Sequence, residues 1–156
     1  MLPSSQMNPY DIISISTNLL LVIPTAIAAT TRSKSAAALA VGVTATALLG
    51  EALKTTIFSA YKRPRGARDC DPLCREGPCS HKPGMPSTHA AVSAFFAAWV
   101  AATTKNYLFT ATATAYYLLV LLARYKKRCH SVAQLAAGSA LGLALGALFF
   151  FSGVGF

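Results

Sequence analysis

Five long apolar stretches limit what this chain can fold into. A helix needs about 20 apolar residues to cross the roughly 30 Å hydrocarbon core of a bilayer. Stretches of about that length occupy approximately 12–31, 36–61, 86–104, 106–123 and 129–152. Of the 156 residues, 54% are hydrophobic and only 12% are charged, which is typical of membrane proteins. The sequence therefore predicts an all-α fold, a polytopic transmembrane helical bundle of about five spans, as a single domain over residues 1–156.

The first of these stretches is expected to stay in the mature protein. The residues before it contain no Lys or Arg, so the basic region of a cleavable signal peptide is missing. Pro24 lies inside the stretch, and we expect it to kink the helix, a defect that neighbouring helices can accommodate.

Residues 62–85 form a polar loop, because their Pro, Gly, Cys and charged residues could not lie in a span. Alternating the spans places this loop, the amino terminus and residues 124–129 on one side of the membrane, here called the loop side. Most of the 14 basic residues also lie there. They fit either the positive-inside rule or a site for a phosphate-bearing ligand. Nucleic acid is not expected as a partner, because the basic blocks lack interleaved aromatic residues.

The last span has a stripe of small residues that favours close helix packing. Gly138, Gly142 and Gly146 recur at four-residue intervals, and Gln134 and His130 continue the series toward the loop side. The packed face of this helix should therefore lead to His130.

Several residues at span ends have the chemistry of a phosphate site. Lys54 lies near the end of the second span, where it could bind an anion, pair with Glu51 or extend to the headgroups. Ser87 and Thr88 open the third span, where the unpaired N–H groups of a helix attract phosphate. His89 follows. It either donates a proton to a leaving group or lies at the membrane interface without a role in catalysis.

Arg124 and His130 come from two adjacent span ends joined by a short turn. A guanidinium offers a planar fork to a phosphoryl group, and a neutral imidazole can attack phosphorus to give a phosphohistidine. Together with Lys54 and His89, they form a set that is less readily explained by chance than any one member.

The order of these residues resembles the three-part signature of the type 2 phosphatidic acid phosphatase superfamily, over residues 54–134. The three parts are Lys54 with Arg63-Pro64, Pro86-Ser87-Thr88-His89, and Arg124 with His130. The resemblance implies a metal-independent phosphohydrolase without a cofactor. It assigns His130 as the nucleophile and His89 as the acid. It assigns Lys54, Arg63 and Arg124, with N–H groups near Ser87 and Thr88, to phosphate binding.

The chain departs from this signature at two positions. Eight residues separate Lys54 from Arg63, where six are usual, so the helix must end or bulge before Arg63 if both bind one phosphate. If Arg63 does not bind the phosphate, Lys62 and Arg65 are the alternative candidates. Gln134 stands where most members have an aspartate that orients the nucleophile. Its amide oxygen can accept the same N–H but supplies no negative charge.

Gln134 and the sequence GMPS before His89 resemble the dolichyl diphosphatase branch of the superfamily. This resemblance implies hydrolysis of a polyprenyl diphosphate, or a related lipid phosphate, at the endoplasmic reticulum membrane. Superfamily members commonly have six spans, whereas five are counted here. A catalytically weak member that binds anionic lipid, or acts as a membrane scaffold, is the alternative. The sequence does not indicate an oligomeric state.

All four cysteines, Cys70, Cys74, Cys79 and Cys129, are predicted on the loop side. They favour two disulfides in an oxidising compartment, with free thiols or a zinc site that includes His81 as the competing interpretations. The charge distribution points to the cytoplasm and the cysteines to the opposite side. We expect the site to face the endoplasmic reticulum lumen.

Overall fold

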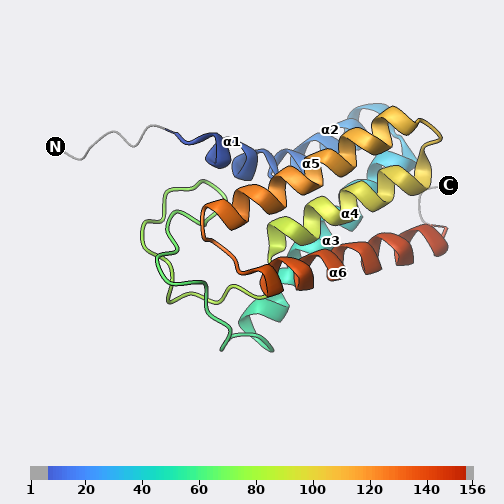
Figure 1. Cartoon of the computed structure of the whole chain (residues 1–156). Helices are drawn as coiled ribbons and strands as arrows, with labels where there is room; N and C mark the ends of the chain where they lie inside the picture. The colour runs from blue at the N-terminus through green and yellow to red at the C-terminus, as the bar shows by residue number, and fades with distance from the viewer. Residues whose placement is uncertain (1–6, 154–156) are drawn as a thin grey trace.

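Helices form the whole framework of the protein. The computed structural model describes residues 7–153. The helices are α1 (Pro9–Ser16), α2 (Leu19–Thr31), α3 (Lys34–Thr55), α4 (Thr88–Thr103), α5 (Tyr107–Lys126) and α6 (Val132–Phe151) (Figure 1). Over residues 7–153 there are no strands, and the extended backbone pairs only in two isolated bridges, Lys62 with Pro83 and Arg68 with Pro78. The predicted all-α fold is confirmed.

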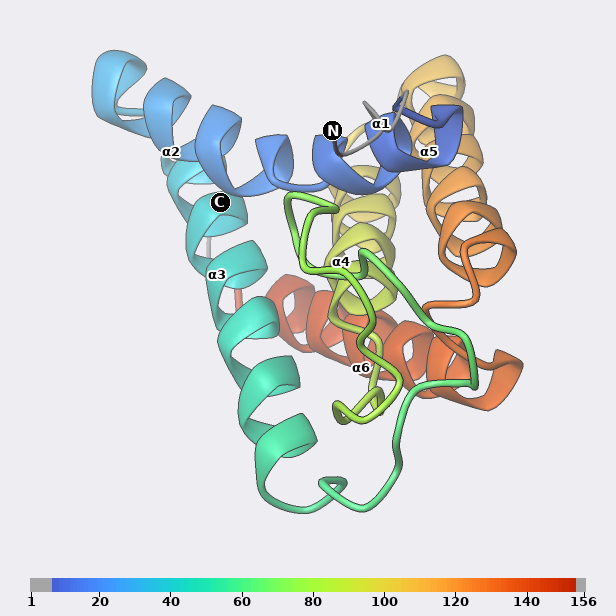
Figure 2. The same ribbon diagram turned by 90° about the vertical axis from the view of Figure 1, so that its left-hand side faces the viewer.

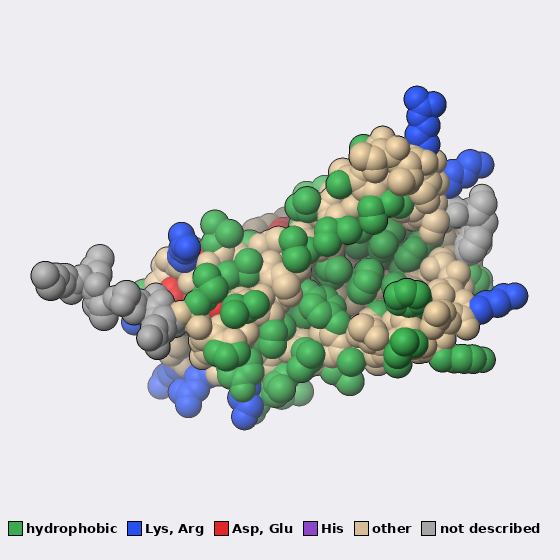
Figure 3. All heavy atoms as spheres, turned by 90° about the horizontal axis from the view of Figure 1, so that it is seen from above, with side chains coloured by type: hydrophobic (Ala, Val, Ile, Leu, Met, Phe, Trp, Pro, Cys, Tyr) green, Lys and Arg blue, Asp and Glu red, His purple; other side chains and the backbone are tan. Residues whose placement is uncertain are grey.

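Four segments are long and apolar enough to cross a membrane: residues 9–31 (α1 with α2), α3, α5 and α6. The remaining predicted span is α4, whose 16 residues extend about 24 Å at 1.5 Å per residue. In Figure 3, hydrophobic side chains cover the middle of the visible face, and basic side chains lie toward both ends. This distribution, with the four long helices, indicates an integral membrane protein.

The first predicted span is two helices rather than one kinked at Pro24. α1 begins with a capping box, in which Asn8 and Asp11 each bind the other's backbone N–H. The interruption between the helices falls at Thr17 and Asn18. Pro24 lies inside α2 and is buried. The break before α2 matters for the site, because Thr17 and Asn18 line its cavity.

The closest helix packing joins α4 to α6 and depends on the predicted small-residue stripe. Gly138, Gly142 and Gly146 are all buried on the face of α6 that meets α4. A Cβ atom at Gly142 would collide with the carbonyl group of Ala91. The missing side chains therefore let the two backbones touch. This packing fixes the start of α4 against the start of α6.

The polar loop between α3 and α4 lies across one end of the bundle (Figure 2). The start of α1 and the turn between α5 and α6 lie at the same end, since Lys127 forms an ion pair with Asp11 and a disulfide joins Cys70 to Cys129. The structure thus brings together at one end the three segments predicted to share the loop side.

Candidate active site

A cavity of about 460 Å³ lies at the loop end of the bundle. Its wall is formed by the junction of α1 and α2, by α3, by the first turns of α4 and by the loop. Five of the residues predicted to bind phosphate or to take part in catalysis are in this wall: Lys54, Arg63, Thr88, His89 and His130. The deeper wall is apolar and comes from the spans themselves, through Leu21, Ala47 and Val92.

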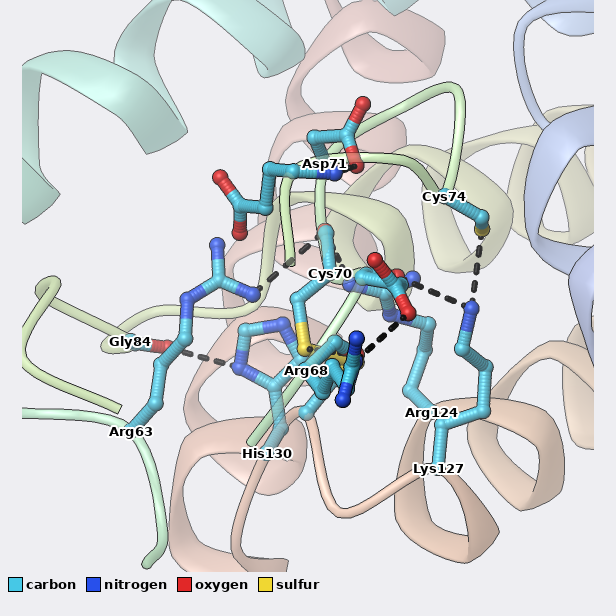
Figure 4. The surroundings of a disulfide bond; sticks show 12 residues. Arg63, Arg68, Cys70, Asp71, Cys74, Gly84, Arg124, Lys127 and His130 are labelled. Carbon is cyan, nitrogen blue, oxygen red and sulfur yellow. Dashed lines mark hydrogen bonds and ion pairs between the residues drawn. A yellow bond between two sulfur atoms is a disulfide. The ribbon is translucent and has the colours of Figure 1, made fainter. Parts of the chain in front are cut away.

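His130 lies in the turn before α6 and is 2% exposed. Its Nδ1 atom is 2.9 Å from the carbonyl oxygen of Gly84 (Figure 4). A carbonyl oxygen can only accept, so Nδ1 carries the proton and Nε2 has the free lone pair. This tautomer is the one a nucleophilic Nε2 requires.

The electrostatic setting keeps His130 neutral. Burial, followed by the nearby positive charges of Arg124 and Arg63, lowers the pKa of His130 well below its usual range. An uncharged imidazole therefore persists at neutral pH without a ligand.

His89 lies in the first turn of α4. Its Nε2 atom is buried, and no group in residues 7–153 forms a hydrogen bond with it. Buried polar atoms without partners are uncommon in folded proteins. Because His89 lines the cavity, this nitrogen is available to a bound molecule.

Lys54 is paired within the cavity wall rather than free. Its Nζ atom donates to Glu51 Oε1 at 2.5 Å and to Thr88 Oγ1 at 2.9 Å, and Thr88 Oγ1 also donates to the same carboxylate oxygen at 2.5 Å. The alternative of an ion pair with Glu51 is thus realised, and the pair still lines the cavity.

Ser87 acts as the amino-terminal cap of α4. It is fully buried, its hydroxyl accepts from the N–H of Ala90, and its own N–H donates to the carbonyl of Gln134 at 3.0 Å. The N–H of Ser87 is therefore occupied. The next two N–H groups, those of Thr88 and His89, are the ones that the first turn leaves for an anion.

Arg63 reaches the cavity because α3 ends well before it. The helix ends at Thr55, and the chain then turns, with the N–H of Phe58 donating to the carbonyl of Leu53. This is the ending that the long spacing between Lys54 and Arg63 requires. Lys62 and Arg65 are exposed and are not among the residues that line the cavity.

Arg124 lies behind the cavity wall instead of in it. It is 0% exposed, and its Nη2 atom donates to the carbonyl of Cys70 at 2.6 Å. Cys70, which lines the cavity, also accepts from Arg63 Nη1 at 3.4 Å (Figure 4). Within residues 7–153, nothing bonds to Nε and Nη1 of Arg124, so these two groups can still donate to an anion that reaches them.

Gln134 was expected to accept a hydrogen bond from His130, but its side chain binds other groups. Its side-chain oxygen accepts from the N–H of Ser131 at 3.1 Å, and its side-chain nitrogen donates to the carbonyl of Lys62 at 2.8 Å. The carbonyl oxygen of Gly84, rather than the side chain of Gln134, contacts Nδ1 of His130.

The cysteines form one disulfide rather than two. Cys70 is bonded to Cys129, whereas Cys74 and Cys79 are free thiols. Since Cys70 is oxidised, it is not available to a zinc site with Cys74, Cys79 and His81. Burial, followed by a hydrogen bond to Glu76, raises the pKa of the Cys79 thiol.

Sequence reasoning missed two backbone groups, the carbonyls of Cys70 and Gly84. Each contacts a predicted site residue that is more than 40 positions away in the chain. The glycine in GMPS was the only available signal, because a glycine often marks close backbone approach.

A family model described as the PAP2 superfamily matches residues 35–153. No curated protein and no solved structure matches the chain significantly. The family match covers most of the chain and contains every residue of the cavity wall from Ala47 to His130. Membership indicates phosphatase activity and, with the membrane-spanning helices, a lipid substrate in the bilayer. The chain belongs to the PAP2 superfamily.

Proposed function

We propose that the protein hydrolyses a lipid phosphate, a polyprenyl diphosphate of the dolichyl type or a related lipid, through a phosphohistidine on His130. The observation behind this proposal is that both histidines line one cavity with Lys54 and Arg63. The cavity is polar at the loop end and apolar at Leu21, Ala47 and Val92. A phosphate headgroup and a hydrocarbon tail would each find a matching surface.

In the first step, Nε2 of His130 attacks phosphorus, and the bond between phosphorus and the leaving oxygen breaks. His89 in its protonated form gives its proton to that oxygen. Lys54 and Arg63, with the N–H groups at the start of α4, stabilise the charge on the transferring group. Arg124 joins them through Nε and Nη1.

In the second step, water attacks the phosphohistidine, and neutral His89 takes the proton from that water. The bond between phosphorus and Nε2 breaks, which releases inorganic phosphate and restores His130. Every step uses side chains of this chain, so we propose that neither a metal nor another cofactor is needed.

The Cys70–Cys129 disulfide supports an oxidising compartment for the loop side, since disulfides persist there. We therefore place the site on the extracytoplasmic face, and for a dolichyl-type substrate in the endoplasmic reticulum lumen.

Phosphate release by the purified protein tests this function. Polyprenyl diphosphate, phosphatidate and phosphatidylglycerol phosphate should be compared in detergent containing a metal chelator. We expect the polyprenyl diphosphate to be the best substrate and His130→Ala to abolish its hydrolysis. The matched control is His81→Ala, because His81 is exposed in the loop and does not line the cavity. Binding of the lipids without turnover would instead identify a binding or scaffold protein.

A further inference from the structure

We propose that Gln134 is a positioning residue that sets the orientation and tautomer of His130 through the backbone carbonyl of Gly84. This inference rests on the proposed function, which makes His130 the nucleophile. It differs from direct orientation by residue 134, because both amide atoms of Gln134 are bound elsewhere.

The connection runs through two paired loop segments, residues 61–63 and 82–84. The N–H of Gly84 donates to the carbonyl of Tyr61 at 2.8 Å, and the N–H of Arg63 donates to the carbonyl of Lys82 at 3.0 Å. Gln134 anchors this pair from α6 by donating to the carbonyl of Lys62 at 2.8 Å. The carbonyl of Gly84, held in this way, accepts from His130 (Figure 4).

Gly84 also lies close to the amide of Gln134. A Cβ atom at Gly84 would lie 2.8 Å from both Nε2 and Oε1 of Gln134, and 3.0 Å from Cγ of Arg63. Such distances are too short for non-bonded atoms, so with a side chain at 84 the Gln134 amide or the loop would have to move. The site therefore needs a glycine here because of close approach.

The demands on residue 134 are specific. Its side chain must accept from the N–H of Ser131 to complete the capping box of α6, and must also donate to the carbonyl of Lys62. Gln does both. Glu keeps the capping function, since either residue can complete a capping box, but an ionised carboxylate has no proton to donate. Asp can also complete a capping box, as Asp11 does at the start of α1, but an ionised Asp likewise has no proton for the carbonyl of Lys62.

Gln134→Glu separates positioning from helix capping. At pH 8 we expect kcat for phosphate release to fall about tenfold, the effect of one lost buried hydrogen bond, with little change in KM and only a small drop in the unfolding temperature, because the capping box remains. At lower pH the carboxyl group becomes protonated and can again donate to Lys62. The activity of the variant relative to wild type should therefore recover as the pH falls. Equal or higher activity of the variant at pH 8 would overturn the proposal.

Histidine 15N NMR gives a readout that does not need turnover. Wild type should show the Nδ1–H tautomer for His130, assigned by its loss in His130→Ala, and Gln134→Glu at pH 8 should show a mixture with the Nε2–H tautomer. An unchanged tautomer would overturn the proposal even if activity falls. Conversely, the expected NMR change in a protein that releases no phosphate would overturn the proposed function alone.

A double-mutant cycle tests the contact between Gly84 and Gln134. Gly84→Ala should lower kcat about tenfold or more in wild type, because the new methyl group meets the Gln134 amide. In a Gln134→Ala background the amide is gone, so the same change should cost clearly less. Additive losses would contradict the proposed coupling.

Discussion

The cavity has a helix half and a loop half, and their residues are held in place in different ways. The helix half consists of Lys54, Thr88 and His89, on α3 and α4. The loop half consists of Arg63, the carbonyls of Cys70 and Gly84, and His130. The helix half is fixed by the packing of spans, whereas the loop half is fixed by hydrogen bonds and a disulfide between distant segments.

This difference indicates which half of the cavity tolerates the loss of a single contact. Residues on a packed helix keep their relative positions when one surface contact is lost. The loop residues depend on single links, such as Gln134 to Lys62 and Cys70 to Cys129. Loss of one link should therefore weaken the loop half, either by misplacing His130 or by lowering its stability, and leave His89 in place.

The largest expected effect that probes the helix half is removal of the acid. His89→Ala should lower kcat/KM, which reports formation of the phosphohistidine, by about 10²- to 10⁴-fold, the usual contribution of general acid–base catalysis. The loss should be smaller for a lipid diphosphate than for a phosphomonoester, because phosphate is a better leaving group than an alcohol. Steady-state phosphate release with both substrates would measure this difference, and equal losses would argue against His89 as the acid.

A smaller effect is expected for the cation of the loop half. Arg63→Ala should lower kcat/KM about 10²-fold, since one charge-stabilising donor is lost from the cavity. Arg65→Ala is the matched control, because Arg65 is exposed and lies two residues away. Phosphate release from the same lipid gives both values. Similar losses in the two variants would mean that the general basic charge of the loop matters, not the placement of Arg63.

The Cys70–Cys129 disulfide joins the loop to the turn before α6. Its loss should lower mainly the stability of the protein. Cys129→Ser should lower the free energy of unfolding by about 2–4 kcal/mol, measured by thermal unfolding in detergent. Cys79→Ser replaces a buried free thiol and leaves the disulfide intact, so it should cost less. If Cys79→Ser destabilised the protein as much as Cys129→Ser, packing rather than the cross-link would hold the loop.

The mildest perturbation is pH. Because the pKa of His130 is lowered by burial and by Arg124 and Arg63, its imidazole should remain neutral below the ordinary histidine value of about 6.5. As the pH falls through the lowered pKa, His130 becomes protonated and loses its nucleophilic lone pair. The acid limb of kcat/KM assigned to His130 should therefore lie below pH 6.5. Titration of His130 by NMR in the free protein would identify that limb, and a His130 pKa at or above 6.5 would contradict the burial.

The helix half could be predicted from the sequence better than the loop half, for the same physical reason. The apolar stretches predicted the helices, and the stripe from Gln134 to Gly146 predicted the face of α6 that packs against α4. Hydrophobicity and helical spacing are local properties that can be read from sequence. The break at Thr17 and Asn18 was not predicted, because Pro24 was the stronger local signal.

Backbone contacts between distant segments have no such local signature. The sequence identified Gln134 as unusual but not its partner, since the carbonyl of Lys62 is brought near only by the folded loop. Arg124 was expected to bind phosphate directly, yet it is not in the cavity wall, and its Nη2 donates to the carbonyl of Cys70, a residue that lines the cavity. Residue type predicted the chemistry at these positions, and tertiary structure determined the contacts.

Trapping of the covalent intermediate tests the nucleophile most directly. The protein should be mixed with polyprenyl diphosphate carrying 32P at its terminal phosphate and quenched in alkaline denaturant, which preserves phosphohistidine. We predict a labelled peptide that contains His130, full labelling in His81→Ala and none in His130→Ala. Rapid phosphate release without any labelled protein, or a label on a residue other than His130, would contradict the proposed mechanism.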